Sequence, residues 1–174
     1  MSRLREEVPI HVVHEGSDEE WTIQVTGDGP WVWRLLSPDE AECEVTGSSA
    51  FEALHAMQDA VSEKNVVLCC NGLRANVRPS HRSASHGAWM VYLLHLWRPA
   101  TVRDLVHVFD YAPPEKIASR NQQDQYWEHH LAARKKWWNL ANPVWWLYFA
   151  TASWGKPKAF KKPPEVQARG KRAQ

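Results

Sequence analysis

The sequence predicts a single α+β or α/β domain, with an N-terminal β-meander and central buried strands in one mixed sheet, packed by about three helices. Three patterns lead to this prediction: short alternating segments near the N-terminus, one segment with apolar residues at helical spacing, and two later runs of consecutive apolar residues. A chain of 174 residues has the length of one domain. We therefore expect the domain to cover residues 1–155, followed by a tail over residues 156–174.

Three segments predict the meander. Residues 9–14 and 21–26 alternate apolar and polar side chains, as strands with one buried face do. Residues 27–30 read Gly-Asp-Gly-Pro, a sequence typical of turns, and they lead into the apolar segment 31–36.

A helix is predicted to follow this meander. Ser48 or Ser49 can cap its N-terminus, and residues 64–65 end it. Its apolar residues recur at spacings of three and four: Phe51, Leu54, Met57 and Val61. This apolar face is expected to lie on the sheet.

Two later segments are predicted to be buried strands. Residues 66–70 form a continuous apolar run that ends at an Asn-Gly turn, and residues 88–96 form a second such run. Runs of this kind are typical of central strands buried on both faces. A polar loop over residues 72–87 joins them.

The C-terminal half is predicted to be helical. Residues 101–104 resemble a capping box with Asp in place of Glu, which predicts a helix to about residue 111. A longer helix is predicted from near residue 115 or 121 to residue 141, before Pro143. Its predicted buried stripe contains Tyr126, His130, Ala133, Trp137 and Leu140, widened by Trp127, Leu131 and Trp138.

The charge of the chain differs between its two ends, and its cysteine content and N-terminal residues bear on the cellular compartment. Residues 1–47 carry eleven acidic residues and three arginines, whereas residues 156–174 carry seven basic residues and one glutamate. The basic segment also contains three prolines and is expected to be extended or disordered without a partner. Three cysteines do not form a disulfide framework, and no apolar run follows the basic N-terminal residues. We therefore expect a soluble, cytoplasmic protein.

The loop 72–87 is a candidate anion-binding site, because it contains three arginines and two histidines but no acidic residue. Its candidate residues are Arg74, Arg78, His81, Arg82 and His86. The alternative is a solvated connection, or arginines paired with the acidic N-terminal segment. The loop matches neither the P-loop nor the dinucleotide-binding pattern.

The sequence assigns no metal ligand, cofactor or catalytic residue. Neighbouring histidine and cysteine pairs point apart on the predicted elements: His11 with His14, His129 with His130, and Cys69 with Cys70. The serines beside His81 and His86 lack the pattern of a nucleophile elbow.

Tryptophan is the most unusual feature of the composition, with eleven residues among 174. The uncharged segment 137–155 is flanked by basic residues, a pattern compatible with a transmembrane helix, an interfacial membrane segment or an ordinary core. The candidate partner-binding residues are Trp127, Trp137, Trp138, Trp145, Trp146 and Trp154.

Three functions follow as hypotheses. The first is a non-enzymatic protein-binding module of the neutraliser, immunity or adaptor kind, because exposed Trp side chains dominate many interfaces. The second is binding of nucleic acid or a nucleotide through Arg74, Arg78, Arg82 and the basic tail. The third is an enzyme with a phosphate or carboxylate site at the loop 72–87, and peripheral membrane contact is a further possible interaction.

Overall fold

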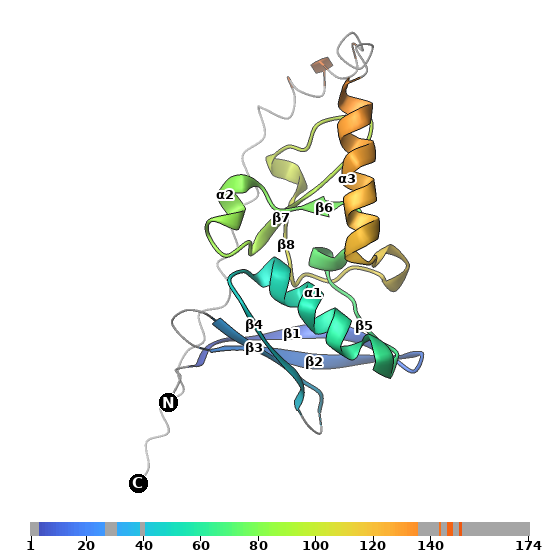
Figure 1. The fold of residues 1–174 in the computed structure, drawn as a ribbon. Coiled ribbons are helices and arrows are strands. Elements are labelled where there is room, and N and C mark those ends of the chain that lie inside the picture. The colour runs from blue at the N-terminus through green and yellow to red at the C-terminus, as the bar shows by residue number, and fades with distance from the viewer. Residues whose placement is uncertain are drawn as a thin grey trace.

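A computed structural model describes residues 4–26, 31–38 and 41–135 and the separate positions 143, 146, 147 and 150. In this part of the chain the fold is α+β, as predicted, with three α-helices and two antiparallel sheets (Figure 1). The predicted tail over residues 156–174 and most of the segment 137–155 lie outside the described residues.

The larger sheet contains the predicted meander. Its strands are β1 (Leu4–His14), β2 (Ser17–Thr26), β3 (Trp31–Leu36), β4 (Ala41–Gly47) and β5 (Val66–Leu68), in the spatial order β4-β3-β2-β1-β5. Alternation along β2 buries Trp21, Ile23 and Val25 on one face. The sequence analysis missed β4, in which exposed Glu44 and Thr46 alternate with partly buried Cys43 and Val45 at the sheet edge.

Helix α1 (Ala50–Val61) covers the inner face of this sheet, and Figure 1 shows it between the sheet and the second half of the fold. The predicted cap is confirmed at Ser49, whose Oγ accepts a hydrogen bond from the backbone nitrogen of Glu52 at 3.3 Å. All four predicted apolar positions of this helix are buried. A 3₁₀ turn (Ser62–Lys64) and the left-handed residue Asn65 then end the helical segment.

The later strands do not join one mixed sheet. Strands β6 (Val77–Arg78), β7 (Met90–Leu93) and β8 (Leu105–His107) form a separate antiparallel sheet in the order β6-β7-β8. Strand β5, predicted to be central, lies at an edge of the described sheet, where it pairs with β1. The 3₁₀ turn Asn71–Leu73 redirects the chain directly after this short strand, so the following segments start a new sheet.

The predicted helix over residues 101–111 is also wrong. The capping box is present, with the Asp104 carboxylate accepting from the backbone nitrogen of Thr101 at 2.8 Å, but it caps only the 3₁₀ turn Val102–Asp104. The next residues form β8 because they pair with β7. The cross-strand partner therefore outweighs the local helix signal.

Helix α3 (Arg120–Lys135) confirms the described part of the longer predicted helix. Its most buried residues are polar: Gln123 and His130 are each 2% exposed. Tyr126 and Trp127 are partly buried beside them, whereas Leu131, predicted for the buried stripe, is 38% exposed. Hydrogen bonds as well as apolar contact therefore hold this helix in place. The short helix α2 (His81–Ala84) lies within the predicted loop 72–87.

Candidate ligand-binding pocket

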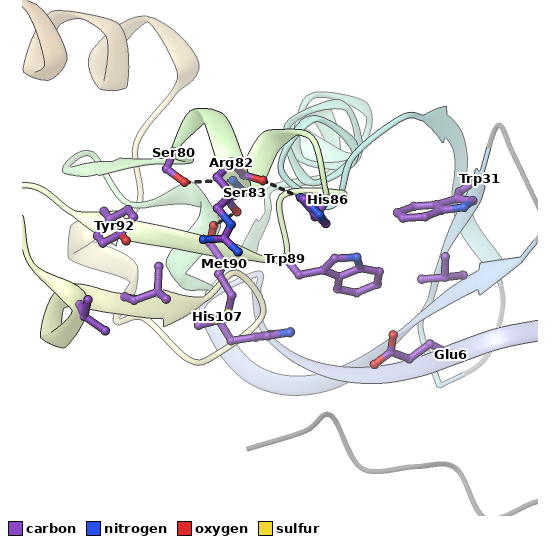
Figure 2. Close-up of a pocket in the computed structure, with 13 residues that line it drawn as sticks. Glu6, Trp31, Ser80, Arg82, Ser83, His86, Trp89, Met90, Tyr92 and His107 are labelled. Carbon is purple, nitrogen blue, oxygen red and sulfur yellow. Dashed lines mark hydrogen bonds between the residues drawn. The ribbon is translucent and has the colours of Figure 1, made fainter. Parts of the chain in front are cut away.

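A pocket of about 830 Å³ opens between the two sheets (Figure 2). One wall comes from the larger sheet and the other from α2, β7, β8 and their connections. The lining residues are Glu6, Val25, Trp31, Ser80, Arg82, Ser83, His86, Trp89, Met90, Tyr92, Val102, Leu105 and His107. Most of the exposed lining surface belongs to apolar atoms, with a few polar groups among them.

Two indole rings meet on the apolar side of the pocket. The ring centroids of Trp31 and Trp89 are 5.9 Å apart. Gly87 lies against both rings: a Cβ atom at this position would come within 2.8 Å of Trp31 Cη2 and 2.8 Å of Trp89 Nε1. Its φ of +82° also favours glycine. Gly87 therefore provides the space that brings the two indoles together.

Glu6 is an acidic residue on the core-facing side of β1. It pairs directly with Val25 of β2, which is 1% exposed, and directly paired residues share one face of a sheet. Burial raises the pKa of the Glu6 carboxyl above its usual value. The strand geometry thus places a partly desolvated carboxylate in a largely apolar pocket.

His107 lines the pocket from β8. Its Nδ1 accepts a hydrogen bond from the backbone nitrogen of Phe109 at 3.4 Å, so its proton is on Nε2 in the neutral ring. Burial lowers the pKa of His107, with Asp110 acting in the opposite direction. The imidazole is therefore a neutral hydrogen-bond donor at neutral pH, and Figure 2 shows it extending toward Glu6.

The wall formed by α2 supplies further polar groups. Nδ1 of His86 lies 2.9 Å from the carbonyl oxygen of Arg82, which can only accept, so Nδ1 carries a proton. In the neutral ring this leaves Nε2 of His86 as an acceptor. Ser80 accepts from the backbone nitrogen of Ser83 at 2.9 Å, and Ser83 Oγ donates to the carbonyl of Met90. Both serines thus make hydrogen bonds that hold this wall together.

The five residues predicted for an anion site do not come together. Arg82 and His86 line the large pocket, whereas Arg78 pairs with Asp124 on α3 and lies over the ring of Trp127. Arg74 hydrogen-bonds the side chains of Asn71 and Asn76. His81 is exposed and lines neither this pocket nor the smaller one beside Arg78.

Two of the six predicted partner-binding tryptophans, Trp127 and Trp146, are among the described residues. Trp127 is half-buried and stacks on His130 with 5.5 Å between ring centroids. Trp146 is 62% exposed. The structure adds Trp97, which is 58% exposed and which the sequence analysis did not select. The remaining candidates lie outside the described residues: Trp137, Trp138, Trp145 and Trp154.

The sequence analysis did not select Glu6, Trp31, Trp89 or His107, which are among the pocket residues. For Glu6 the sequence does contain a signal. Val8, Ile10 and Val12 follow it at every second position, so all four residues share one face of β1. No spacing in the sequence links the other three residues, which come from β3, β8 and the residue before β7.

Comparison with known proteins leaves this pocket as the main basis for assigning a function. A scan against protein-family models finds no match for the chain, and no curated protein matches its sequence. Within the described part of the chain, no helix is long and apolar enough to cross a membrane. The same residues contain no cluster of three or more side chains that could hold a metal ion.

Proposed function

We propose that the protein binds a small organic molecule with an apolar, ring-sized body in the pocket between the two sheets. The pocket itself carries this proposal: its volume of about 830 Å³ is in the range of small-molecule sites, and its walls are mainly apolar with a few polar groups. Trp31 and Trp89 offer ring surface, while His86 and His107 offer one acceptor and one donor. Such groups suit a ligand that stacks and is oriented by hydrogen bonds.

The neutral compound 1-naphthalenemethanol tests this proposal in a direct binding titration. Val102 lines the pocket and is 54% exposed, so Val102→Trp adds a bulky ring at its rim with little effect on the core. Leu96 is 42% exposed and does not line the pocket, which makes Leu96→Trp the matched control. We expect the wild type and Leu96→Trp to bind equally, and Val102→Trp to lose about tenfold or more in affinity.

Two results would refute the proposal. One is the absence of binding to the wild type, and the other is equal binding by the two folded tryptophan variants. Thermal unfolding of both variants shows whether each retains the native fold.

Protein docking is a second candidate function, favoured by the exposure of large apolar residues. Trp97 and Trp146 are exposed, and Leu147 is 71% exposed. Exposed aromatic residues are enriched at the centres of protein interfaces. Substituting Trp97 and Trp146 together with Ala is expected to abolish binding of a protein partner and to leave 1-naphthalenemethanol binding unchanged. Nucleic-acid binding has less support, because Arg74 and Arg78 already have contacts within the protein.

A further inference from the structure

We propose that the pocket selects an organic cation, namely an aromatic ring that carries an alkyl primary amine. The ammonium group of this ligand binds the carboxylate of Glu6, and the inference rests on the proposed function. The apolar body would then lie against the pocket walls that include Trp31 and Trp89. Glu6 would thus give the pocket a preference for cationic ligands.

Among the described residues that line the pocket, Glu6 is the only carboxylate. No described residue forms a hydrogen bond or an ion pair with it, and burial alone accounts for its raised pKa. Elsewhere in the described chain, Glu44 pairs with Arg34 and Asp104 pairs with Arg98. A partly buried carboxylate that has no cationic partner among the described residues gains most from a ligand that brings one.

The neighbouring aromatic residues favour the same ligand charge. Trp31 and Trp89 line the pocket together with Glu6, and Figure 2 shows both rings on the Glu6 side of the pocket. The face of an indole carries negative electrostatic potential and attracts cations. Aromatic rings recognise ammonium ligands, and a carboxylate pairs with the same charge, so a ligand that carries an alkylammonium group on an aromatic ring suits both.

The other titratable residues in the pocket do not reverse this preference. His107 is neutral at neutral pH because burial lowers its pKa. Arg82 on α2 is exposed, so water screens its charge more strongly than that of Glu6, and His86 in the turn after α2 is exposed as well. Tyr92 also lines the pocket, from β7.

A series of three ligands with one ring system tests the inference: 1-naphthylmethylamine, 1-naphthalenemethanol and 1-naphthoate. We expect the wild type at pH 7 to bind the amine about tenfold more tightly than the alcohol, and the carboxylate least tightly. Glu6→Gln removes the charge with little change in shape. This variant should bind the amine only as tightly as it binds the alcohol.

Glu7→Gln is the matched control, because Glu7 is exposed and pairs with Gln24 on the opposite face of the sheet. It should leave all three affinities unchanged. Equal wild-type affinities for amine and alcohol, tightest binding of the carboxylate, or an unchanged amine affinity in Glu6→Gln would each overturn the inference. In those cases the pocket still binds the alcohol, whereas failure of the proposed function appears as loss of binding for the whole series.

Discussion

Gln123 on α3 and His55 on α1, 68 positions apart in the sequence, are joined by a buried hydrogen bond of 3.0 Å between Oε1 and Nε2. The amide nitrogen of Gln123 donates to the carbonyl oxygens of Gly72 at 3.1 Å and Arg74 at 2.9 Å. The amide oxygen must therefore accept from His55, which places the proton of His55 on Nε2. One side chain thus connects α3 to α1 and to the turn that precedes the second sheet.

Replacement of Gln123 is expected to destabilise the protein strongly. Gln123→Ala leaves a buried imidazole N–H and two backbone carbonyls without these partners, which should lower the free energy of unfolding by about 2–4 kcal/mol. Gln125 lies on the same helix and is exposed, so Gln125→Ala should change the free energy of unfolding by less than about 0.5 kcal/mol. Urea unfolding measures both values, and equal effects would contradict the role of Gln123.

Gly87 and Gly16 provide a second matched comparison, since their φ angles are +82° and +84°. An added Cβ at Gly16 meets no atom within 4 Å, whereas at Gly87 it meets the rings of Trp31 and Trp89. Gly16→Ala should cost only the backbone strain, about 1–2 kcal/mol. Gly87→Ala should cost about 1–3 kcal/mol more, because the indoles must move. Equal unfolding free energies of the two variants would show that the contact is unimportant.

The ion pair between Arg98 and Asp104 should contribute more than the exposed pair between Arg34 and Glu44. Arg98 is 8% exposed and donates to both carboxylate oxygens of Asp104, each at 2.6 Å. Asp104→Asn is expected to lower the free energy of unfolding by about 3–5 kcal/mol, because the buried guanidinium loses its countercharge. Glu44→Gln should lower it by less than about 1 kcal/mol. Chemical denaturation at neutral pH compares the two, and a similar loss in both would contradict this difference.

Stability should fall when the pH drops below about 6.5, the usual pKa of histidine. Burial lowers the pKa of His55, His107 and His130 in the folded state, so the unfolded chain binds protons more readily in this range. Each residue stabilises the fold above the unfolded pKa, and this contribution is lost as the pH falls. Urea unfolding between pH 7.5 and 5.5 should therefore show a shallower pH dependence for His55→Gln than for the wild type. A wild-type slope in His55→Gln would contradict this contribution of His55.

Glu6 should have the opposite effect on the pH dependence of stability, because its side chain makes the fold less stable as the pH rises. Its folded-state pKa is raised by burial, so its contribution to stability is complete below the unfolded pKa and is lost as the pH rises through the folded value. Glu6→Gln is therefore expected to be more stable than the wild type at pH 7, with the difference shrinking as the pH approaches 4. Paired urea titrations at both pH values measure this change. A Glu6→Gln variant that is less stable at pH 7 would contradict the unfavourable burial of this charge.

The elements predicted correctly are those whose signal is local. Alternation along residues 9–14 and 21–26 and the spacing from Phe51 to Val61 reflect the repeats of strand and helix, and Ser49 caps α1 through a residue three positions away. The capping box predicted at Thr101 and Asp104 is also present. It did not produce a helix, because the residues that follow it pair with β7.

Two of the pocket residues could be singled out from the sequence, since Arg82 and His86 lie in a loop without acidic residues, and an anion site in that loop stays a prediction. Glu6, Trp31 and His107 could not, because they come from three strands of two sheets and no motif joins them. Their grouping depends on how the sheets pack.

For this protein, the order of side chains along the chain determined which faces of β2, β3 and α1 are apolar, because backbone geometry repeats every few residues. Tertiary structure alone decided that a second sheet forms, that Gln123 reaches His55, and that Glu6 shares a pocket with Trp89. These relationships join residues tens of positions apart. They depend on which buried surfaces pack together, and a local sequence pattern holds no information on that choice.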